Sequence, residues 1–371
     1  MSQHHPASAK QVRILGIETS CDETAAGIIV RDEQGRGRIE ANVIRSQWEE
    51  HRAFGGVVPE IAARAHVECI DEIIALALAE AGVTLDKIDA VASTAGPGLI
   101  GGLLVGLTTA KAIATATRKP LLAINHLEAH ALTVGLTNGL APPYMLLLVS
   151  GGHTQIVLVA ALGHYYRLGT TIDDALGEAF DKTAKLLDLG FPGGPAVERH
   201  AQDGDPRRFD FPTPLKGRPE PHFSFAGLKT AVRRQAQKLA PLSPTDIADL
   251  CASFERAVCD SVGDRIVKAY EIAMTDYARF GTSLPLVAAG GVARNTRLRH
   301  ALEQIAAAIG VKLYIPPAQL CTDNGAMIAW AGAEHYINGH TSSMGFAARA
   351  RWPLDETSPA VYGSGKHGAK A

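Results

Sequence analysis

The chain has 371 residues, of which 46% are hydrophobic and 20% charged, a composition typical of a protein with two domains of ordinary size. Its formal net charge of −2 excludes a basic field over the whole surface, so any site for a polyanion has to be a local patch. The five cysteines are scattered and contain no C-x-x-C pair, which argues against a disulfide framework and for a reducing compartment.

The two ends of the chain differ in composition from the rest. The first eleven residues are polar and lack the apolar core of a secretory signal, and we find no apolar run that reaches the length of a membrane span. We expect residues 1–11 and 347–371 to be flexible ends and the protein to be cytoplasmic.

The first half of the chain is expected to open with three strands and to continue with alternating helices and strands. In chain order, the predicted elements are strands at 12–20, 25–30 and 39–46, a helix at 58–81 that stops at Gly82, a strand at 88–94, a helix at 101–117, a strand at 120–124 and a helix that begins near residue 126.

The same order then starts again. The predicted elements are strands at 144–150, 155–160 and 165–170, helices at 173–188, 195–202, 225–239 and 245–279, a strand from 284 that runs into a helix start near 295, and a helix at 323–338. Strand–helix alternation predicts an α/β fold with sheets covered by helices, in two domains over 12–140 and 141–346. Two such halves facing each other predict an interdomain cleft, a common place for ligands.

Two histidines stand four residues apart in "INHLEAHALT". On a helix, His126 and His130 are neighbours on one face and could share a metal ion, although two partly buried histidines bonded to backbone carbonyls fit the spacing as well. Glu128 lies roughly 200° around the helix from His126, so it is a poor base for a metal-bound water and a protease is disfavoured. Asp323, at the head of a later helix, is either a helix cap or a third ligand.

Polar and glycine-rich turns follow several predicted strands. The turns "ETSCDET" and "SGGHT" occupy equivalent places in the two halves, where they are either ordinary hairpin turns or anion sites. Gly290 and Gly291 allow a flat ligand to approach the backbone closely. Asn295 is either a helix cap or a hydrogen-bonding partner of a ribose or base.

The segment 205–240 is locally basic, with eight Lys and Arg against three acidic residues. Together with Phe223 and Phe225, it reads either as a solvated helix face or as a footprint for a phosphate backbone with aromatic rings near a base.

Ten motifs in this order resemble the TsaD/Gcp family of tRNA N6-adenosine threonylcarbamoyltransferases over about residues 13–346. They are "GIETSCDET", "GGVVPEIAARAH", "AGPGLIGGLLVG", "INHLEAH", "LLVSGGHTQ", "TIDDALGEAFDKTAKLL", "FPGGP", "FSFAGLKT", "AAGGVARN" and "CTDNGAMIAW". The resemblance implies two RNase H-like domains of the actin/sugar-kinase/heat-shock ATPase type.

The resemblance also implies roles for single residues, with no catalytic side chain beyond the metal ligands. It makes His126, His130 and Asp323 the ligands of one divalent metal, with Fe²⁺ expected and Zn²⁺ as the alternative. The residues it implies for substrate binding are Val149, Ser150, Gly151, Gly152 and His153 on the phosphate side, and Asp181, Gly194, Asn295 and Glu198 around the nucleotide, although relatives often carry Asp or another residue in place of Glu198.

The implied reaction transfers a threonylcarbamoyl group from threonylcarbamoyl-adenylate to the exocyclic amine of the adenosine beside the anticodon, in tRNAs that read codons beginning with A. Two other functions stay open: a small-molecule kinase of the same fold, and a nucleotide-binding scaffold subunit. Implied partners are tRNA, an inactive TsaB-like paralogue and a small TsaE-like ATPase, with no membrane.

Overall fold

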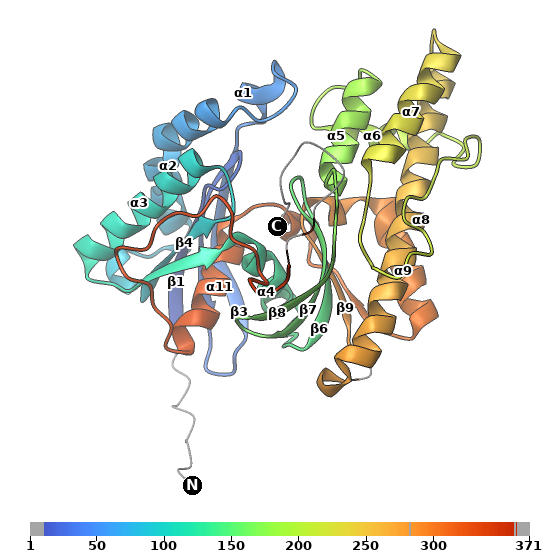
Figure 1. Cartoon of the computed structure of the whole chain (residues 1–371). Coiled ribbons are helices and arrows are strands. Elements are labelled where there is room, and N and C mark those ends of the chain that lie inside the picture. Colours follow the sequence, from blue (N-terminus) through green and yellow to red (C-terminus); the bar gives the residue numbers. More distant parts are fainter. Residues whose placement is uncertain (1–10, 282, 360, 362–371) are drawn as a thin grey trace. The chain divides into compact units, whose positions relative to one another are not determined.

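The structure, a computed structural model, describes residues 11–281, 283–359 and 361, and the chain divides into two compact units (Figure 1). The first unit comprises residues up to His51, Val57–Ala141 and Thr322–Leu354. The second comprises Arg52–Gly56, Pro142–Cys321 and the residues from Asp355 onward.

The first unit contains one five-stranded sheet and the helices that cover it. Its elements are β1 (Val12–Glu18), β2 (Glu23–Arg31), β3 (Gly37–Ser46), α1 (Trp48–Arg52, whose last residue falls in the second unit), α2 (Pro59–Ala81), η1 (Leu85–Lys87), β4 (Ala90–Gly96), α3 (Ile100–Thr117), β5 (Leu121–Asn125), α4 (His126–Asn138) and α11 (Gly325–Ile337).

The second unit also contains one five-stranded sheet, with a larger set of helices. Its elements are β6 (Tyr144–Val149), β7 (Thr154–Ala161), β8 (His164–Thr170), α5 (Leu176–Leu186), α6 (Gly193–Ala201), α7 (Ala226–Leu239), α8 (Pro244–Asp276), η2 (Ala278–Phe280), β9 (Leu286–Ala289), η3 (Gly291–Arg294), α9 (Thr296–Ile309), β10 (Leu313–Tyr314) and α10 (Ala318–Cys321).

The two sheets have the same topology. The strand order is β3-β2-β1-β4-β5 in the first and β8-β7-β6-β9-β10 in the second. In each, the first strand pairs antiparallel with the second and parallel with the fourth. The duplication expected from the order of the elements is therefore present in the strand pairing as well, and the α/β fold class is confirmed.

Helix α11 lies directly on the first sheet, and glycines make this close packing possible. A Cβ on Gly16 of β1 would lie 2.4 Å from the carbonyl oxygen of Gly325, and one on Gly27 of β2 would lie 2.3 Å from the nitrogen of Ala326. The second domain was expected to cover residues 141–346. In the structure, the segment Thr322–Leu354, which contains α11, belongs to the first unit instead. Asp323 therefore belongs to the same unit as His126 and His130.

Helices α2 and α3 cover the other face of the same sheet (Figure 1). Leu15 and Ile17 of β1 alternate with Gly16 and pack in one apolar cluster with Ile70 of α2 and Ala110 of α3. Among the described residues, α3 alone is long and apolar enough to cross a membrane, contrary to the expectation that no run reaches that length. Its buried face packs against α2 and β4, as a core helix does.

The segment expected to be a flexible tail is partly ordered. Arg349 donates its backbone N–H to the carbonyl of Ala95 at 2.7 Å. Asp355 is 7% exposed and accepts hydrogen bonds from the backbone of Arg167 and from the backbone and hydroxyl groups of Thr357 and Ser358. Residues 1–10, 360 and 362–371 of the two expected flexible ends lie outside the described residues.

Candidate metal centre and nucleotide pocket

The junction between β5 and α4 fixes where the histidine helix begins. The side chain of Asn125 caps the helix, accepting the backbone N–H groups of Leu127 at 2.9 Å and Glu128 at 3.4 Å. Helix α4 therefore starts at His126, at the carboxyl end of a parallel strand, and His130 follows one turn later on the same face.

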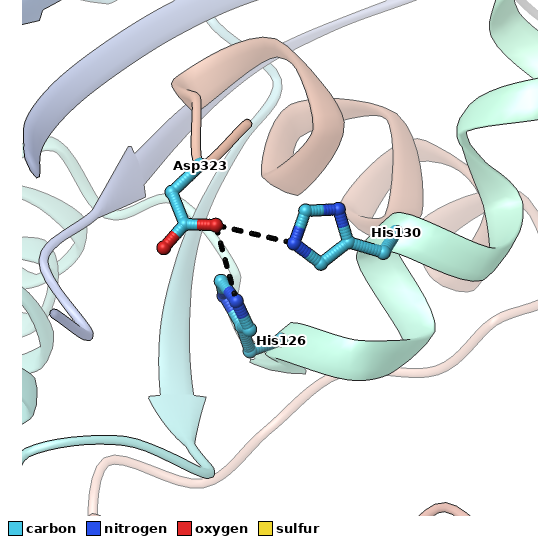
Figure 2. A group of neighbouring side chains, drawn as sticks. All are labelled: His126, His130 and Asp323. Carbon is cyan, nitrogen blue, oxygen red and sulfur yellow. Dashed lines mark hydrogen bonds and ion pairs between the residues drawn. The ribbon is translucent and has the colours of Figure 1, made fainter. Parts of the chain in front are cut away.

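The two imidazoles and Asp323 converge on one point (Figure 2). Nε2 of His126 lies 3.4 Å from Oδ1 of Asp323, and Nε2 of His130 lies 3.2 Å from the same oxygen. Two atoms that each bind one ion at roughly 2.1 Å stand about 3.0–3.4 Å apart, so these two distances match edges of a coordination sphere, and the three ligand atoms together lie within 4.8 Å of one another. The three side chains therefore fit a single divalent metal, which two imidazoles and one carboxylate hold with positions left open.

Glu18, at the end of β1, orients the first of these histidines. Its Oε2 accepts a hydrogen bond from Nδ1 of His126 at 2.9 Å, and the side chain is fully buried. Burial by itself raises the pKa of Glu18, but the imidazole of His126 outweighs it and leaves that pKa below its ordinary value. The contact places the proton of His126 on Nδ1 and leaves Nε2 free to bind metal.

Buried charges around the cluster shift one another's pKa values. Burial disfavours the charged form of His126, yet the carboxylates of Asp323 and Glu18 hold its pKa well above the ordinary value. Burial also opposes the ionisation of Asp323, and the two imidazoles nevertheless keep its pKa low. Since protons and a metal ion compete for these atoms, metal binding at this cluster has to release protons.

Glu128 points away from the cluster, as its place on the helix predicts. Its Oε2 lies 2.7 Å from Nε2 of His335, near the end of α11. The carboxylate is therefore engaged with a histidine that is not one of the three candidate ligands. This geometry excludes Glu128 as the base of a metalloprotease site built on His126 and His130.

A separate cavity of about 360 Å³ lies within the second unit. Five residues predicted to bind substrate line it: Gly151, Asp181, Gly194, Glu198 and Asn295. The cavity is also lined by residues that the sequence did not indicate: Gly177, Phe180, Pro192, Pro195, Val292, Arg294 and Ala318. Its size and its mixture of apolar walls and a few polar side chains are typical of a small-molecule pocket.

Of the remaining predicted residues, Val149 is the last residue of β6, and Ser150, Gly152 and His153 form the β6–β7 turn with Gly151; none of these four lines the cavity. The turn is closed by a hydrogen bond from the backbone N–H of Ser150 to the carbonyl of His153 at 2.8 Å. A Cβ on Gly151 or Gly152 would meet no atom within 4 Å. Open space beside a backbone turn is what a bound phosphate needs.

Glycines after β9 hold the backbone close to the same turn. Gly290 has φ of +95°, and a Cβ there would lie 2.3 Å from the carbonyl oxygen of Val149. A side chain at this position is therefore excluded by both conformation and space. Gly290 was expected to let a flat ligand approach the backbone, but the atoms that it approaches belong to β6, whereas Gly291 lines the cavity.

Glu198 has a structural contact that the sequence did not indicate. Its Oε1 accepts the backbone N–H of Thr296 at 2.8 Å, and Oδ1 of Asn295 accepts that of Leu298 at 2.8 Å. Both side chains cap the start of α9 while they line the cavity. The two readings of Asn295, helix cap and ligand contact, are therefore compatible.

Not all cations of the basic segment 205–240 are free to bind a phosphate, because some of them pair with acidic side chains of the protein. Arg208 forms ion pairs with Asp246 and Asp249, and Lys229 pairs with Asp174. The exposed cations for which the described residues provide no ion pair are Arg207, Lys216, Arg218, Arg233, Arg234 and Lys238.

The aromatic residues proposed to lie near a base are buried. Phe223 and Phe225 are 0% exposed and stack on each other in the core, with ring centroids 5.9 Å apart. Their hydrophobic packing therefore corrects the expectation that they contact a nucleobase. Phe209 instead lines a hollow with Arg234 and Lys238.

Comparison with known proteins identifies the family. Residues 38–330 match the family model of TsaD, tRNA N6-adenosine threonylcarbamoyltransferase. The chain is 61% identical to the tRNA N6-adenosine threonylcarbamoyltransferase of Rhizobium meliloti (strain 1021), with 97% of this chain and 100% of the relative covered. Identity and coverage are the same for the enzyme of that name from Brucella anthropi.

Solved structures agree with the fold. HypF from T. kodakarensis superposes with a TM-score of 0.58 at 16% identity, over 89% of this chain and 48% of that one. Component A of (R)-2-hydroxyglutaryl-CoA dehydratase from Acidaminococcus fermentans superposes with a TM-score of 0.51 at 17% sequence identity. The superposition covers 88% of this chain and 99% of that one. These likenesses show the two-unit fold of the actin/sugar-kinase/heat-shock ATPase group, and the sequence matches show that the chain belongs to the TsaD family of tRNA N6-adenosine threonylcarbamoyltransferases.

Proposed function

We propose that this chain transfers the threonylcarbamoyl group of threonylcarbamoyl-adenylate to N6 of the adenosine beside the anticodon, in tRNAs that read codons beginning with A. The observation that carries the proposal is the convergence of His126, His130 and Asp323 on one point in a member of this family. The reaction forms a bond between N6 and the carbamoyl carbon, breaks the bond to the adenylate oxygen, and releases AMP and a proton.

In this proposal His126, His130 and Asp323 hold one divalent metal, Fe²⁺ by expectation and Zn²⁺ as the alternative. When bound, the metal supplies a Lewis acid that polarises the carbamoyl carbonyl. Glu18 keeps Nε2 of His126 directed at that position through its hydrogen bond to Nδ1. Its contribution is therefore to keep the first ligand preorganised.

The cavity of the second unit holds the adenylate part of the donor. Backbone N–H groups of residues 149–153, at the end of β6 and in the turn that follows it, face its phosphate, while Asp181, Gly194 and Asn295 contact the nucleoside, with Glu198 beside them. Support comes from the convergence of Gly151, Asp181, Gly194, Glu198 and Asn295 on one cavity. A rigid pocket of this kind supplies the orientation that a weak nucleophile such as an exocyclic amine requires.

Transfer is direct, with no covalent enzyme intermediate. A cysteine nucleophile requires a thiolate, and burial raises the pKa of Cys251 and of Cys259 to about 12. Burial likewise raises the pKa of Cys21, in the turn between β1 and β2, well above its ordinary value. These three thiols are therefore protonated at neutral pH.

The exposed cations of segment 205–240 contact the phosphates of the tRNA near its anticodon stem-loop. Arg233, Arg234 and Lys238 lie together on α7, and two of them line the hollow that contains Phe209. An exposed anticodon loop offers splayed bases next to its phosphates, which suits a hollow with cations and an aromatic ring.

The protein works in the cytoplasm with an inactive TsaB-like paralogue and a small TsaE-like ATPase. A docking surface for the paralogue is available on α2 and α3, where Val67, Ile100 and Leu104 are 62%, 49% and 52% exposed. The two helices are in contact beside these residues, since a Cβ on Gly101 would lie 2.9 Å from that of Ala63. Replacing Val67 and Leu104 by Glu should abolish co-purification of the paralogue without loss of the fold.

A tRNA modification assay with synthetic threonylcarbamoyl-adenylate tests the proposal as a whole. The modified nucleoside should form in wild-type reactions and be lost in the His126→Ala/His130→Ala variant. Equal product from the two proteins would refute the role assigned to the metal cluster.

A further inference from the structure

The amide of Asn295 is held in one orientation by two partners of opposite kind. Its Oδ1 accepts the backbone N–H of Leu298 at 2.8 Å, and its Nδ2 donates to Oε1 of Glu255 at 2.6 Å. A backbone N–H requires an oxygen and a carboxylate requires a donor, so flipping the amide would break both bonds. The polarity of this side chain in the pocket is therefore fixed.

Glu255 is a buried acid that the proposed chemistry does not otherwise use. It lies on α8, is 3% exposed and does not line the cavity, whereas Asn295 does. Its second carboxylate oxygen lies 3.4 Å from Nε of Arg297, on the first turn of α9. A buried carboxylate destabilises a protein unless it has such partners. Its position directly behind a residue of the pocket therefore suggests that the carboxylate acts on that residue.

We propose that Glu255 is a positioning residue that makes Asn295 a hydrogen-bond donor to the nucleoside. An amide nitrogen carries two hydrogens, of which Glu255 takes one and the pocket receives the other. The matching group on the ligand is an acceptor, either a ring nitrogen of the base or a ribose oxygen. The inference rests on the proposed nucleotide pocket and adds the residue that sets the direction of one of its hydrogen bonds.

A purely structural role for Glu255 is the competing explanation. In that case the acid would only tie α8 to the start of α9, and its loss would lower stability without a specific effect on nucleotide binding. The two explanations differ in what happens when the hydrogen-bond directions between residues 255 and 295 are reversed.

The first experiment measures AMP binding to the full chain by calorimetry, together with its melting temperature. Asn295→Ala should weaken binding about tenfold, the usual effect of one hydrogen bond to a ligand. Glu255→Ala should weaken it by a similar factor, and the Asn295→Ala/Glu255→Ala protein should bind no more weakly than Asn295→Ala alone. Glu255→Gln should retain affinity within about threefold, because its amide oxygen still accepts from Nδ2.

The second experiment exchanges the two groups in the Asn295→Asp/Glu255→Gln protein. The carboxylate introduced by Asn295→Asp can still cap α9 and accept from the new amide, so the melting temperature should recover relative to Asn295→Asp alone. The pocket would now face an acceptor where it had a donor, so AMP affinity should stay at least about tenfold below wild type.

Recovery of both stability and affinity in the exchanged pair would overturn the inference, as would additive losses in the double alanine variant. Unchanged AMP affinity in Glu255→Ala, when Asn295→Ala weakens binding, would overturn it as well. Unchanged affinity in a folded Asn295→Ala protein would instead refute the proposed pocket, so the two failures are distinguishable.

Discussion

Nδ1 of His126 lies 2.9 Å from a carboxylate oxygen of Glu18, while Nε2 on the other side of the ring faces Asp323 at 3.4 Å. One imidazole thus connects a fully buried acid to the point where three ligand atoms converge. The same fold contains a second pair of this kind, Glu128 and His335, that does not reach this point. The two pairs provide a matched test of the metal centre.

We predict that Glu18→Ala weakens metal binding about 10–100-fold, the usual cost of removing the acid behind a metal-binding histidine. Glu128→Gln should leave the metal in place, because His335 is not one of its ligands. Metal content after dialysis against a graded chelator measures both variants. Equal metal loss in Glu18→Ala and Glu128→Gln would contradict the assigned roles.

We expect His126→Ala, His130→Ala and Asp323→Ala each to lose the bound metal while the fold survives. Each substitution removes one of only three protein ligands, and the first unit's sheet does not depend on them for its packing. Elemental analysis of anaerobically purified protein, with circular dichroism as the control for folding, measures the effect. Stoichiometric metal in the His126→Ala/His130→Ala protein would show that the metal binds elsewhere.

Gly151→Val should block AMP binding without removing metal, because a side chain would occupy the space beside the turn where a phosphate approaches the backbone. Gly152→Val should have the smaller effect, since Gly152 does not line the cavity. Calorimetry measures both, and Gly227→Ala, in open space on α7, is the control. Wild-type affinity in a folded Gly151→Val protein would refute the phosphate role of the turn.

Replacing the exposed cations Arg207, Arg233, Arg234 and Lys238 together, each by Gln, should weaken tRNA binding and reduce the slope of log K against log salt. Phosphate contacts act through counterion release, so four lost contacts should reduce the slope by about 3–4. Arg208 is left unchanged because its ion pairs with Asp246 and Asp249 serve the fold.

The control for this experiment removes four exposed cations of the first unit, Arg36, Arg38, Arg64 and Lys87, which changes net charge equally; unlike the test residues, each of these pairs with an acidic side chain at the surface. AMP affinity should be unchanged in both proteins. Binding should be measured on the isolated chain and on the assembly with its partner subunits. If the salt slope of the test variant equals that of wild type in both, segment 205–240 is a solvated surface.

The hydrogen bonds of Asp355 with Arg167, Thr357 and Ser358 should stabilise the folded state, and this stabilisation should be lost in acid. Burial raises its pKa, but hydrogen bonds from Ser358, Thr357 and Arg167 outweigh this and lower the pKa from 3.8 to about 2. The folded state therefore holds the ionised form more strongly than the unfolded state, and the stabilisation is present above about pH 4 and lost as the pH falls through about 2.

Asp355→Asn should accordingly lower the free energy of unfolding by about 1 kcal/mol at neutral pH and by less near pH 2. Urea unfolding at both pH values measures the difference. A penalty that grows on acidification would contradict the assigned interactions.

Local patterns in the sequence predicted the local structure well. Gly82 ends α2 as predicted, and the spacing of His126 and His130 placed two imidazoles on one helical face. Short apolar segments between turns indicated the strands of both sheets. These features depend on neighbours within a few residues, which is the range over which periodicity and capping act.

Contacts between distant segments were harder to predict. Asp323 belongs with the first unit because α11 packs on glycines of β1 and β2, about 300 residues away along the chain. The acid behind His126 is Glu18, 108 residues earlier. Glu255 gave no signal beyond an acid within an apolar helix, and Phe223 gave none that distinguished a core ring from one that stacks on a base. Tertiary packing decides these cases.

The most direct test of the central claim combines the purified chain, its partner subunits, unmodified tRNA that reads an A-starting codon, and synthetic threonylcarbamoyl-adenylate. Nucleoside analysis by mass spectrometry follows the modified adenosine, and AMP is measured in the same samples. We predict equal amounts of modified adenosine and AMP from the wild-type chain, with no modified adenosine from the His126→Ala/His130→Ala protein. AMP release without modified adenosine from the wild-type assembly, or modification undiminished in that variant, would contradict the account.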